Sequence, residues 1–519
     1  MIRRLLILTG IIAISVNIGL WAGTTPIVPR NPGIRLGNGM RITAVTPSNK
    51  SPQPSQDIHI AAETAPLPRP PVAGFSPLIA IVTSDRRSSD DFDWEQALAS
   101  SYVGKPLSAP AEKNFVVGIL DSGSVVDLAA GDSAQILGLT GSHLTTSEFP
   151  IGGVSGTANT TITQPIGVFA AGLAAIDPNG QLDLTKLVGH TNVAALASPA
   201  ISCDNGEDVS AIVGTPFIAF YTTIIRVDQP RRVAVRGQAY IGPDIQITDS
   251  YTPSPAVYRH QIPMELGGLS PVATASYYAF PDLTDWENIL GEWLPLTPTL
   301  LSMGAMTLPT GGSFFAEVGV LQGQPGPLNI LRTGRMLVDT GAQSSIISSN
   351  LAAKLNLPLE PDFTAQICGV GGSSEVPGYY LDYVRIDALG GALEFAHVPF
   401  IVLDMESPEG GSLDGILGMN FFWNRNVVLE PTTSGAGFLH LSDPVPYAYI
   451  DLNDDGLVDG MDFAVFAAAW RTTPADPAWN PRCDLFLDET IDAHDLEAFM
   501  DSWLNMLGKE PFAGQSQLE

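Results

Sequence analysis

The chain has 519 residues, a length that accommodates two to four domains. Its 25 Lys and Arg stand against 54 Asp and Glu, and a surface with a formal charge of −29 repels nucleic acid and anionic membranes, so neither is an expected partner. Only 15% of the residues are charged, whereas the 51 Gly and 42 Pro favour a mainly β, loop-rich chain over helical bundles. Three cysteines are too few for a disulfide scaffold, and their pairing stays open.

The N-terminus reads as an export signal. Arg3 and Arg4 precede a mainly apolar run that ends at Gly23, so residues 1–23 are expected to be a signal peptide, with an uncleaved membrane anchor as the alternative. The protein is therefore expected to be secreted or held at the cell surface. Residues 24–90 are rich in Pro, Ser and Thr and are interpreted as a linker or a propeptide, two alternatives that composition does not separate.

An acid ends an apolar strand at two places in the chain. The sequence "VVGILDSGSVVDL" (116–128) runs through an apolar strand into Asp121, and "RMLVDTGAQSSIIS" (335–348) does the same at Asp339. A hydroxyl residue, a glycine and a small residue follow each acid. Because a single buried carboxylate is costly unless something shares or hydrogen-bonds it, each acid calls for a partner, and each supplies one for the other.

The two stretches begin a repeated unit. "IGGVSG" (151–156) follows Asp121, and "ICGVGG" (367–372) follows Asp339. Later, an apolar pair and a glycine recur in "AIVGTPF" (211–217) and "GILGMNF" (415–421). Three matched landmarks in the same order indicate a duplication rather than two chance turns.

The doubled Asp-Ser/Thr-Gly with these followers resembles the pepsin-like and retropepsin-like aspartic proteases, over roughly residues 112 to 440. The second half is the closer match. The resemblance implies a mainly β, two-lobed fold with a cleft between the lobes. The expected boundaries are lobe 1 at 91–230, an inter-lobe connection at 231–315 that contains further strands, and lobe 2 at 316–443.

The chemistry of the resembled family fits these residues. Two carboxyl groups that share one proton can activate a water and protonate a peptide carbonyl, so Asp121 and Asp339 are the predicted catalytic pair. The resemblance implies that the hydroxyls of Ser122 and Thr340 brace the two loops against each other. Gly123 and Gly341 permit close backbone approach. Ser124 is expected to hydrogen-bond its own acid where lobe 2 has Ala342, an asymmetry that would make the two acids inequivalent.

One departure keeps a second function open. Pepsin-like enzymes carry a tyrosine in the first lobe's hairpin, and residues 151–172 contain none. The alternative to a secreted aspartic endopeptidase is therefore a non-catalytic adhesion or scaffold protein that retains the fold. Because both halves of the predicted site lie in one chain, we expect the protease unit to be a monomer that acts on a protein or peptide. The alternative is a dimer in which the second lobes of two chains form the site, and it is less needed because the chain has its own first lobe.

The C-terminus has a different pattern. "DLNDDGLVDGMD" (451–462) places oxygen-bearing residues at the positions of a calcium loop, with glycine at the sharp turn. A similar unit, "DLFLDETIDAHD" (484–495), follows 33 residues later, although Phe486 and Glu489 replace a ligand and the glycine. We therefore expect calcium to bind strongly in the first loop and weakly or not at all in the second. The predicted ligands are Asp451, Asn453, Asp455, Leu457, Asp459 and Asp462 in the first loop, and Asp484, Asp488, Thr490, Asp492 and Asp495 in the second.

This pair of loops resembles a type I dockerin module, expected at 449–507, as a small α-helical calcium-loop domain. The resemblance implies a cohesin-like partner protein and display at a cell surface. Calcium is the one cofactor expected, and catalysis is expected to need none.

Overall fold

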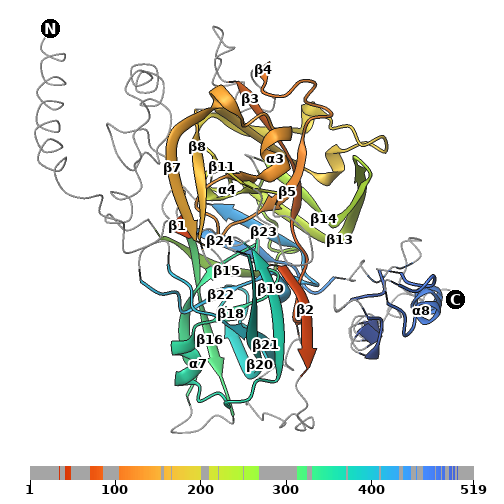
Figure 1. Cartoon of the computed structure of the whole chain (residues 1–519). Coiled ribbons are helices and arrows are strands. Elements are labelled where there is room, and N and C mark those ends of the chain that lie inside the picture. The colour runs from red at the N-terminus through yellow and green to blue at the C-terminus, as the bar shows by residue number, and fades with distance from the viewer. Residues whose placement is uncertain are drawn as a thin grey trace, which may run out of the picture.

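A computed structural model describes most of the two lobes and part of the C-terminal region (Figure 1). The described residues are 34–35, 41–47, 70–85, 105–152, 157–164, 166–199, 210–219, 221–248, 251–267, 313–323, 330–369, 372–407, 411–431, 436–445, 450, 452, 460–473, 475–480, 482–485, 490–493, 495–496 and 499–500. The expected mainly β class is confirmed, because strands dominate these residues. The expected signal or anchor at 1–23 lies outside them.

The first lobe is built on one sheet, which has 11 strands among the described residues. In spatial order these are β1 (Ile34–Arg35), β7 (Leu144–Gly152), β8 (Thr157–Thr163), β11 (Leu196–Ser198), β6 (Leu128–Ala130), β12 (Ala211–Val213), β5 (Val116–Leu120), β3 (Leu78–Asp85), β9 (Ile166–Gly172) and β10 (Val188–Val193), with β4 (Lys105–Pro106) on β3. The helical segments are α3 (Gly131–Ile136), η2 (Gly141–His143), η3 (Leu173–Ala175), η4 (Leu184–Lys186) and α4 (Thr215–Ile218).

The second lobe is built on another sheet, in which 13 strands are described. Their order is β14 (Gln238–Thr248), β13 (Thr222–Val235), β23 (Val427–Pro431), β24 (Ala436–Leu441), β15 (His260–Gly267), β16 (Ser313–Leu321), β17 (Arg332–Val338), β22 (Gly415–Leu417), β18 (Ile346–Ile347), β21 (Leu393–Val402), β20 (Gly372–Ile386), β19 (Phe363–Gly369) and β2 (Arg41–Pro47). Its helical segments are α7 (Ser349–Lys354) and η6 (Met419–Phe422).

The two sheets contain the same supersecondary unit. In lobe 1, β5 pairs in parallel with β12, β12 pairs antiparallel with β6, and β6 pairs in parallel with β11. In lobe 2, β17, β22, β18 and β21 repeat these three pairings in the same order and sense. The duplication that the landmarks predict is thus present in the strand topology.

The hairpin of β13 and β14 joins the lobes. β13 pairs with β23 of lobe 2, while a Cβ on Gly172 of lobe 1 would collide with the backbone of Ile245 in β14, so the hairpin packs tightly on both sheets. One apolar cluster accordingly runs through both lobes, with members from Phe75 to Leu441.

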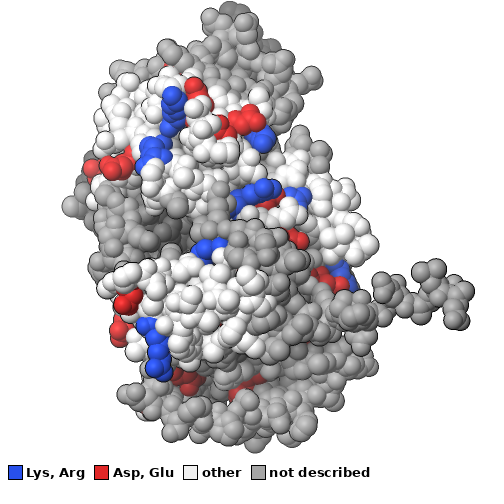
Figure 2. Space-filling view, turned by 90° about the vertical axis from the view of Figure 1, so that its right-hand side faces the viewer, with Lys and Arg blue, Asp and Glu red and all other residues white. Residues whose placement is uncertain are grey.

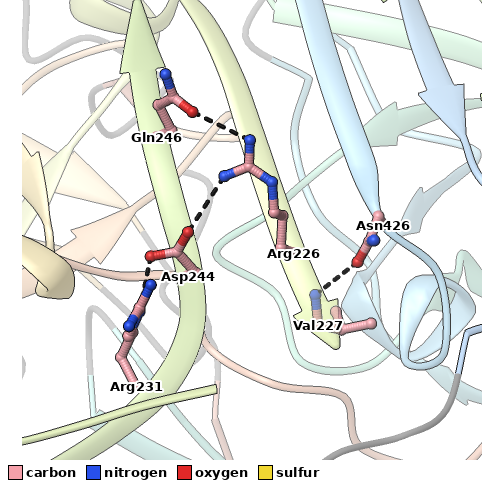
Figure 3. A network of polar contacts seen from close by, with 6 residues as sticks. All are labelled: Arg226, Val227, Arg231, Asp244, Gln246 and Asn426. Carbon is pink, nitrogen blue, oxygen red and sulfur yellow. Dashed lines mark hydrogen bonds and ion pairs between the residues drawn. The ribbon is translucent and has the colours of Figure 1, made fainter. Parts of the chain in front are cut away.

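A polar network sits on that hairpin where β13 bulges between Arg226 and Pro230 (Figure 3). The buried Asp244 accepts from Arg226 at 3.2 Å and from Arg231 at 2.9 Å, which pairs its charge. Asn426 of lobe 2 accepts from the backbone N–H of Val227 at 2.9 Å. The hairpin therefore pairs the charge of Asp244 and satisfies the Val227 N–H where it bends between the lobes.

Residues 70–85 belong to the folded body, not to a linker. β3 is a central, buried strand of the first sheet, because its run of apolar residues packs on both faces. Just before it, Pro71 O accepts from Asn420, Gly74 N–H donates to Gln343 O, and Pro77 O accepts from Leu120 N–H. Within the predicted linker or propeptide at 24–90, residues 70–85 are therefore folded and do not form a linker.

One face of the molecule carries few charges among its described residues. On the face that Figure 2 shows, Lys and Arg lie beside Asp and Glu in small mixed groups, and most described side chains are uncharged. No helix among the residues described is long and apolar enough to cross a membrane.

Candidate active site

The two acids lie at equivalent strand ends. Asp121 follows β5 and its N–H donates to Val213 O at 2.9 Å, while Asp339 follows β17 and its N–H donates to Leu417 O at 3.1 Å. Val213 and Leu417 each end the short parallel strand beside the acid's own strand. The apolar-apolar-Gly landmarks of the sequence are therefore the strands that position the acids.

Each carboxyl group is fixed by its own loop. Oδ1 of Asp121 accepts from the N–H groups of Gly123 at 2.9 Å and Ser124 at 3.0 Å. Oδ1 of Asp339 accepts from Gly341 at 2.8 Å and Ala342 at 3.0 Å. One oxygen of each acid is thus used for orientation by two backbone donors.

The loops are tied together by a reciprocal brace between Ser122 and Thr340. The Ser122 N–H donates to Thr340 Oγ1, and the Thr340 N–H donates to Ser122 Oγ, both at 3.0 Å. The hydroxyls then donate across the junction, Ser122 to Val338 O and Thr340 to Leu120 O, both at 2.7 Å. The brace that the family resemblance implies is present in full, with both residues buried.

Glycine contacts show how close the two acids lie. A Cβ on Gly123 would stand 2.5 Å from Cγ of Asp339, and a Cβ on Gly341 would stand 2.5 Å from Oδ2 of Asp121. Each glycine is therefore pressed against the opposite lobe's carboxyl group, and no larger residue fits. The side chains of Asp121 and Asp339 are 0% and 1% exposed, so in this state solvent does not reach them freely.

Ser124 does not act as the sequence suggested. Its hydroxyl donates to Val126 O at 2.7 Å, and only its backbone N–H contacts Asp121. Since Ala342 offers the same backbone contact in lobe 2, the serine hydroxyl does not make the two acids inequivalent.

A real inequivalence lies deeper, at a residue that the sequence analysis missed. Asp127, six positions after Asp121, accepts from Gly214 N–H at 2.8 Å; Ser345, six positions after Asp339, accepts from Gly418 N–H at 2.9 Å. Asp127 is buried, and burial raises its pKa to about 7, an effect that the Gly214 hydrogen bond partly opposes. The sequence signal that identifies Asp127 is an acid inside the apolar run "SVVDLAA" (124–130). It stands at the position that corresponds to Ser345 of lobe 2.

The C-terminal repeats share contacts at a 33-residue offset. The last predicted ligand of each loop reaches back to the second position: Asp462 Oδ1 accepts from Leu452 N–H, and Asp495 Oδ1 accepts from Leu485 N–H, both at 2.6 Å. Phe466 of α8 (Gly460–Ala468) and its counterpart Phe499 are buried and stacked, with ring centroids 5.4 Å apart. The two repeats therefore pack as a pair around one apolar core.

The structure describes only some of the predicted calcium ligands. Asp462, Asp484, Thr490, Asp492 and Asp495 belong to the described residues, while Asp451, Asn453, Asp455, Leu457, Asp459 and Asp488 lie outside them. Within the described part of the chain, no three His, Cys, Asp or Glu side chains gather in a group that could hold a metal. In the second loop, both oxygens of Asp495 accept backbone N–H groups instead, from Leu485 and Asp492.

Comparison with known proteins supports the resemblance of the second lobe to aspartic proteases. Residues 326–421 match the family model described as Aspartyl protease. The matched range contains Asp339, its brace partner Thr340 and the strand β22. No curated protein matches the chain. Among solved structures, an aspartic proteinase from Irpex lacteus is similar, with 14% identity, 72% of this chain and 98% of that chain covered, and a TM-score of 0.33.

Proposed function

We propose that this protein is an aspartic-type endopeptidase that hydrolyses peptide bonds with Asp121 and Asp339. The observation that carries the proposal is the reciprocal contact of each glycine with the opposite carboxyl group, which puts the two acids side by side. A family match over lobe 2 and the same loop contacts in lobe 1 support it. Ser122 and Thr340 keep the loops in register.

The reaction needs one proton between the two acids. The ionised carboxyl group takes a proton from a water as its oxygen attacks the peptide carbonyl carbon, and the protonated one donates to the carbonyl oxygen. The tetrahedral diol then collapses: one acid takes back a proton, the other protonates the leaving nitrogen, and the C–N bond breaks. Both acids return to their starting states, so no external cofactor is needed for this step.

A peptide-library digestion across pH, with and without a transition-state peptide inhibitor, tests the proposal. Cleavage should be favoured on the acid side, where the pair keeps its proton, and the inhibitor should abolish it. A pure, folded protein that cleaves no peptide at any pH and does not bind the inhibitor would instead favour the adhesion or scaffold function.

We further propose a calcium-binding docking module at 449–507, on a protein that is secreted or displayed at the cell surface. The acidic and carbonyl oxygen donors of the first loop suit calcium: Asp451, Asn453, Asp455, the Leu457 carbonyl, Asp459 through water, and Asp462. Bound calcium would hold the loop folded, and the paired Phe466 and Phe499 support a two-repeat module. A cohesin-like protein is the proposed partner.

Calorimetric titration of the full chain with Ca²⁺ tests this module. Asp451→Asn should abolish the strongest site, and the matched change Asp484→Asn at the first position of the second loop should leave it intact. An equal loss of calcium affinity in both variants would contradict the proposed difference between the two loops. An absence of binding heat in the unaltered protein would contradict the calcium site itself.

A further inference from the structure

The side chain of Asn420 links two distant parts of the chain beneath Asp339. It belongs to η6 and is fully buried. Its Oδ1 accepts from the hydroxyl of Ser345 at 2.8 Å, and its Nδ2 donates to Pro71 O at 3.2 Å. Both ends of the amide are therefore used, one by lobe 2 and the other by a residue that precedes β3 of lobe 1.

Further hydrogen bonds lead from Asn420 to Asp339, and we call this run of bonds the relay. The hydroxyl of Ser345 accepts from the Gly418 N–H at 2.9 Å. The carbonyl of the same peptide unit, Leu417 O, accepts from the Asp339 N–H at 3.1 Å. Because a buried donor or acceptor that loses its partner is costly, a shift of the Asn420 amide is passed along the relay to the acid.

The segment that receives the Asn420 amide is wedged into lobe 2. We define residues 71–77, which come just before β3, as the arm. Val72 is buried in an apolar cluster whose other buried members all belong to lobe 2. The Gly74 N–H donates to Gln343 O at 2.8 Å, and a Cβ on Gly74 would stand 2.4 Å from the carbonyl carbon of Met419. The arm is thus fixed directly beside η6.

The other end of the arm contacts the strand that positions Asp121. Pro77 O accepts from the Leu120 N–H at 2.9 Å, and Leu120 is the last residue of β5 before the acid. Leu120 O in turn accepts from the Thr340 hydroxyl of the brace at 2.7 Å. One short segment therefore contacts the supports of both acids.

Lobe 1 has no counterpart of the Asn420 amide. Two positions after Gly214 it has Pro216, whose side chain neither donates nor accepts a hydrogen bond. The Gly214 N–H donates to Asp127 instead, and the other carboxyl oxygen of Asp127 has no hydrogen-bond partner among the described residues. The relay to the arm is therefore a feature of lobe 2, and a change at Asn420 acts on the acid of that lobe.

We propose that Asn420 is a positioning residue for Asp339 and that the arm is its support, so that the lobe 2 half of the acid pair is completed by a segment from upstream of lobe 1. The effect on cleavage rests on the proposed function, whereas the relay itself does not. A residue that places an acid without touching the substrate affects the chemical step, so the effect belongs in kcat and not in KM.

Peptide cleavage by the full chain, measured well below its unfolding temperature, tests this role. Asn420→Ala should lower kcat by about tenfold or more and leave KM within about twofold. Asn426→Ala is the matched control, because it removes another buried amide, the acceptor for the Val227 N–H (Figure 3). Both variants should unfold at lower urea concentrations, and only Asn420→Ala should lose kcat. Equal kcat values in the two variants would overturn the role.

Two further variants separate positioning from a loss of folding. Asn420→Asp fits the same space, and in acid buffer its buried carboxyl keeps a proton to donate to Pro71 O, so kcat should recover to within about threefold of the unaltered protein. Gly74→Ala pushes a methyl group onto the backbone of Met419 and should lower kcat at constant KM. Combined with Asn420→Ala it should add little, because both act through the relay. Losses that multiply, or no recovery in Asn420→Asp, would contradict the relay.

Amide hydrogen exchange detects the relay without catalysis. Exchange at Asp339 and Gly418 should be faster by about tenfold or more in Asn420→Ala and unchanged in Asn426→Ala. This result, together with an unaltered protein that cleaves no peptide, would confirm the relay and contradict the proposed enzyme. Unchanged exchange at both amides in Asn420→Ala would overturn the relay whether or not the protein cleaves peptides.

Discussion

Lobes 1 and 2 orient their acids with the same contacts, both across the junction of the lobes and within each lobe's own loop, and they differ in the layer beneath the acids. The brace of Ser122 and Thr340 and the glycine contacts are mirrored almost to the tenth of an ångström. Beneath the acids, the same backbone donor is satisfied by Asp127 in one lobe and Ser345 in the other. The contacts that orient the acids are therefore duplicated, whereas the layer beneath them needs only an acceptor for one glycine N–H, which a carboxyl group or a hydroxyl can supply.

The largest expected effect comes from filling the glycine contacts. Gly123→Ala and Gly341→Ala each put a methyl group onto the opposite carboxyl group, so peptide cleavage should fall by about a hundredfold or more, since small misplacements of reacting groups have effects of that size. Steady-state cleavage assays measure this. Gly237→Ala, where a Cβ meets no atom within 4 Å, is a control for loss of a glycine as such, although its positive φ will cost some stability. Equal activity in all three variants would mean that the glycines do not hold the acids together.

The next effect is a pH dependence that belongs to lobe 1 alone. The pKa of Asp127 is raised from 3.8 to about 7, so the folded state keeps a proton that the unfolded chain releases. Its contribution to the free energy of unfolding is therefore fully present below pH 4 and is lost as the pH rises towards 7, a change on the order of 4 kcal/mol. A salt-bridged carboxylate has the opposite pH dependence, because its contribution to the free energy of unfolding is lost as the pH falls.

Asp127→Asn keeps an acceptor for Gly214 and removes this titration. Urea unfolding at several pH values should give similar stability to the unaltered protein near pH 4 and higher stability above pH 7. Ser345→Ala is the matched change in lobe 2: it removes the acceptor for Gly418 and should cost about 1–3 kcal/mol at every pH. A pH-independent difference in the Asp127 variant would show that the acid is not buried as described.

A smaller effect is expected from the brace. Thr340→Ala removes the acceptor for Ser122 N–H and the donor to Leu120 O, so the free energy of unfolding should fall by about 1–3 kcal/mol. Ser122→Ala removes the mirror-image pair and should cost a similar amount. Thr340→Ser keeps both hydrogen bonds and should stay within about 1 kcal/mol of the unaltered protein. A large difference in the free energy of unfolding between the two alanine variants would contradict the equivalence of the two halves of the brace.

The sequence predicted the parts of this site that repeat. Asp121, Asp339 and the hydroxyls beside them were found because the same residue types recur in the same order with the same followers. Ser124 was misassigned, because spacing does not tell which acceptor a rotating hydroxyl selects. Asp127 was missed because its partner is a backbone N–H 87 residues away, which no residue pattern records.

Long-range pairing explains the remaining misses in the fold. β3 was placed in the predicted linker or propeptide because its neighbours in sequence are rich in Pro, yet its strand partners β5 and β9 lie far along the chain. β1 and β2 were not predicted, since β1 has only 2 residues and the pairing of both strands depends on edges that form only when the lobes fold. The Arg226–Asp244 network likewise depends on a bulge in a long hairpin.

The central claim is that Asp121 and Asp339 form one catalytic unit, and the direct measurement is peptide cleavage by Asp121→Asn, Asp339→Asn and the double variant beside the unaltered protein. Each single variant should lose activity by at least about a thousandfold while remaining folded, and the double variant should be no worse, because residues that act as a unit are non-additive. Substantial activity in Asp121→Asn, or losses that multiply in the double variant, would contradict a shared pair.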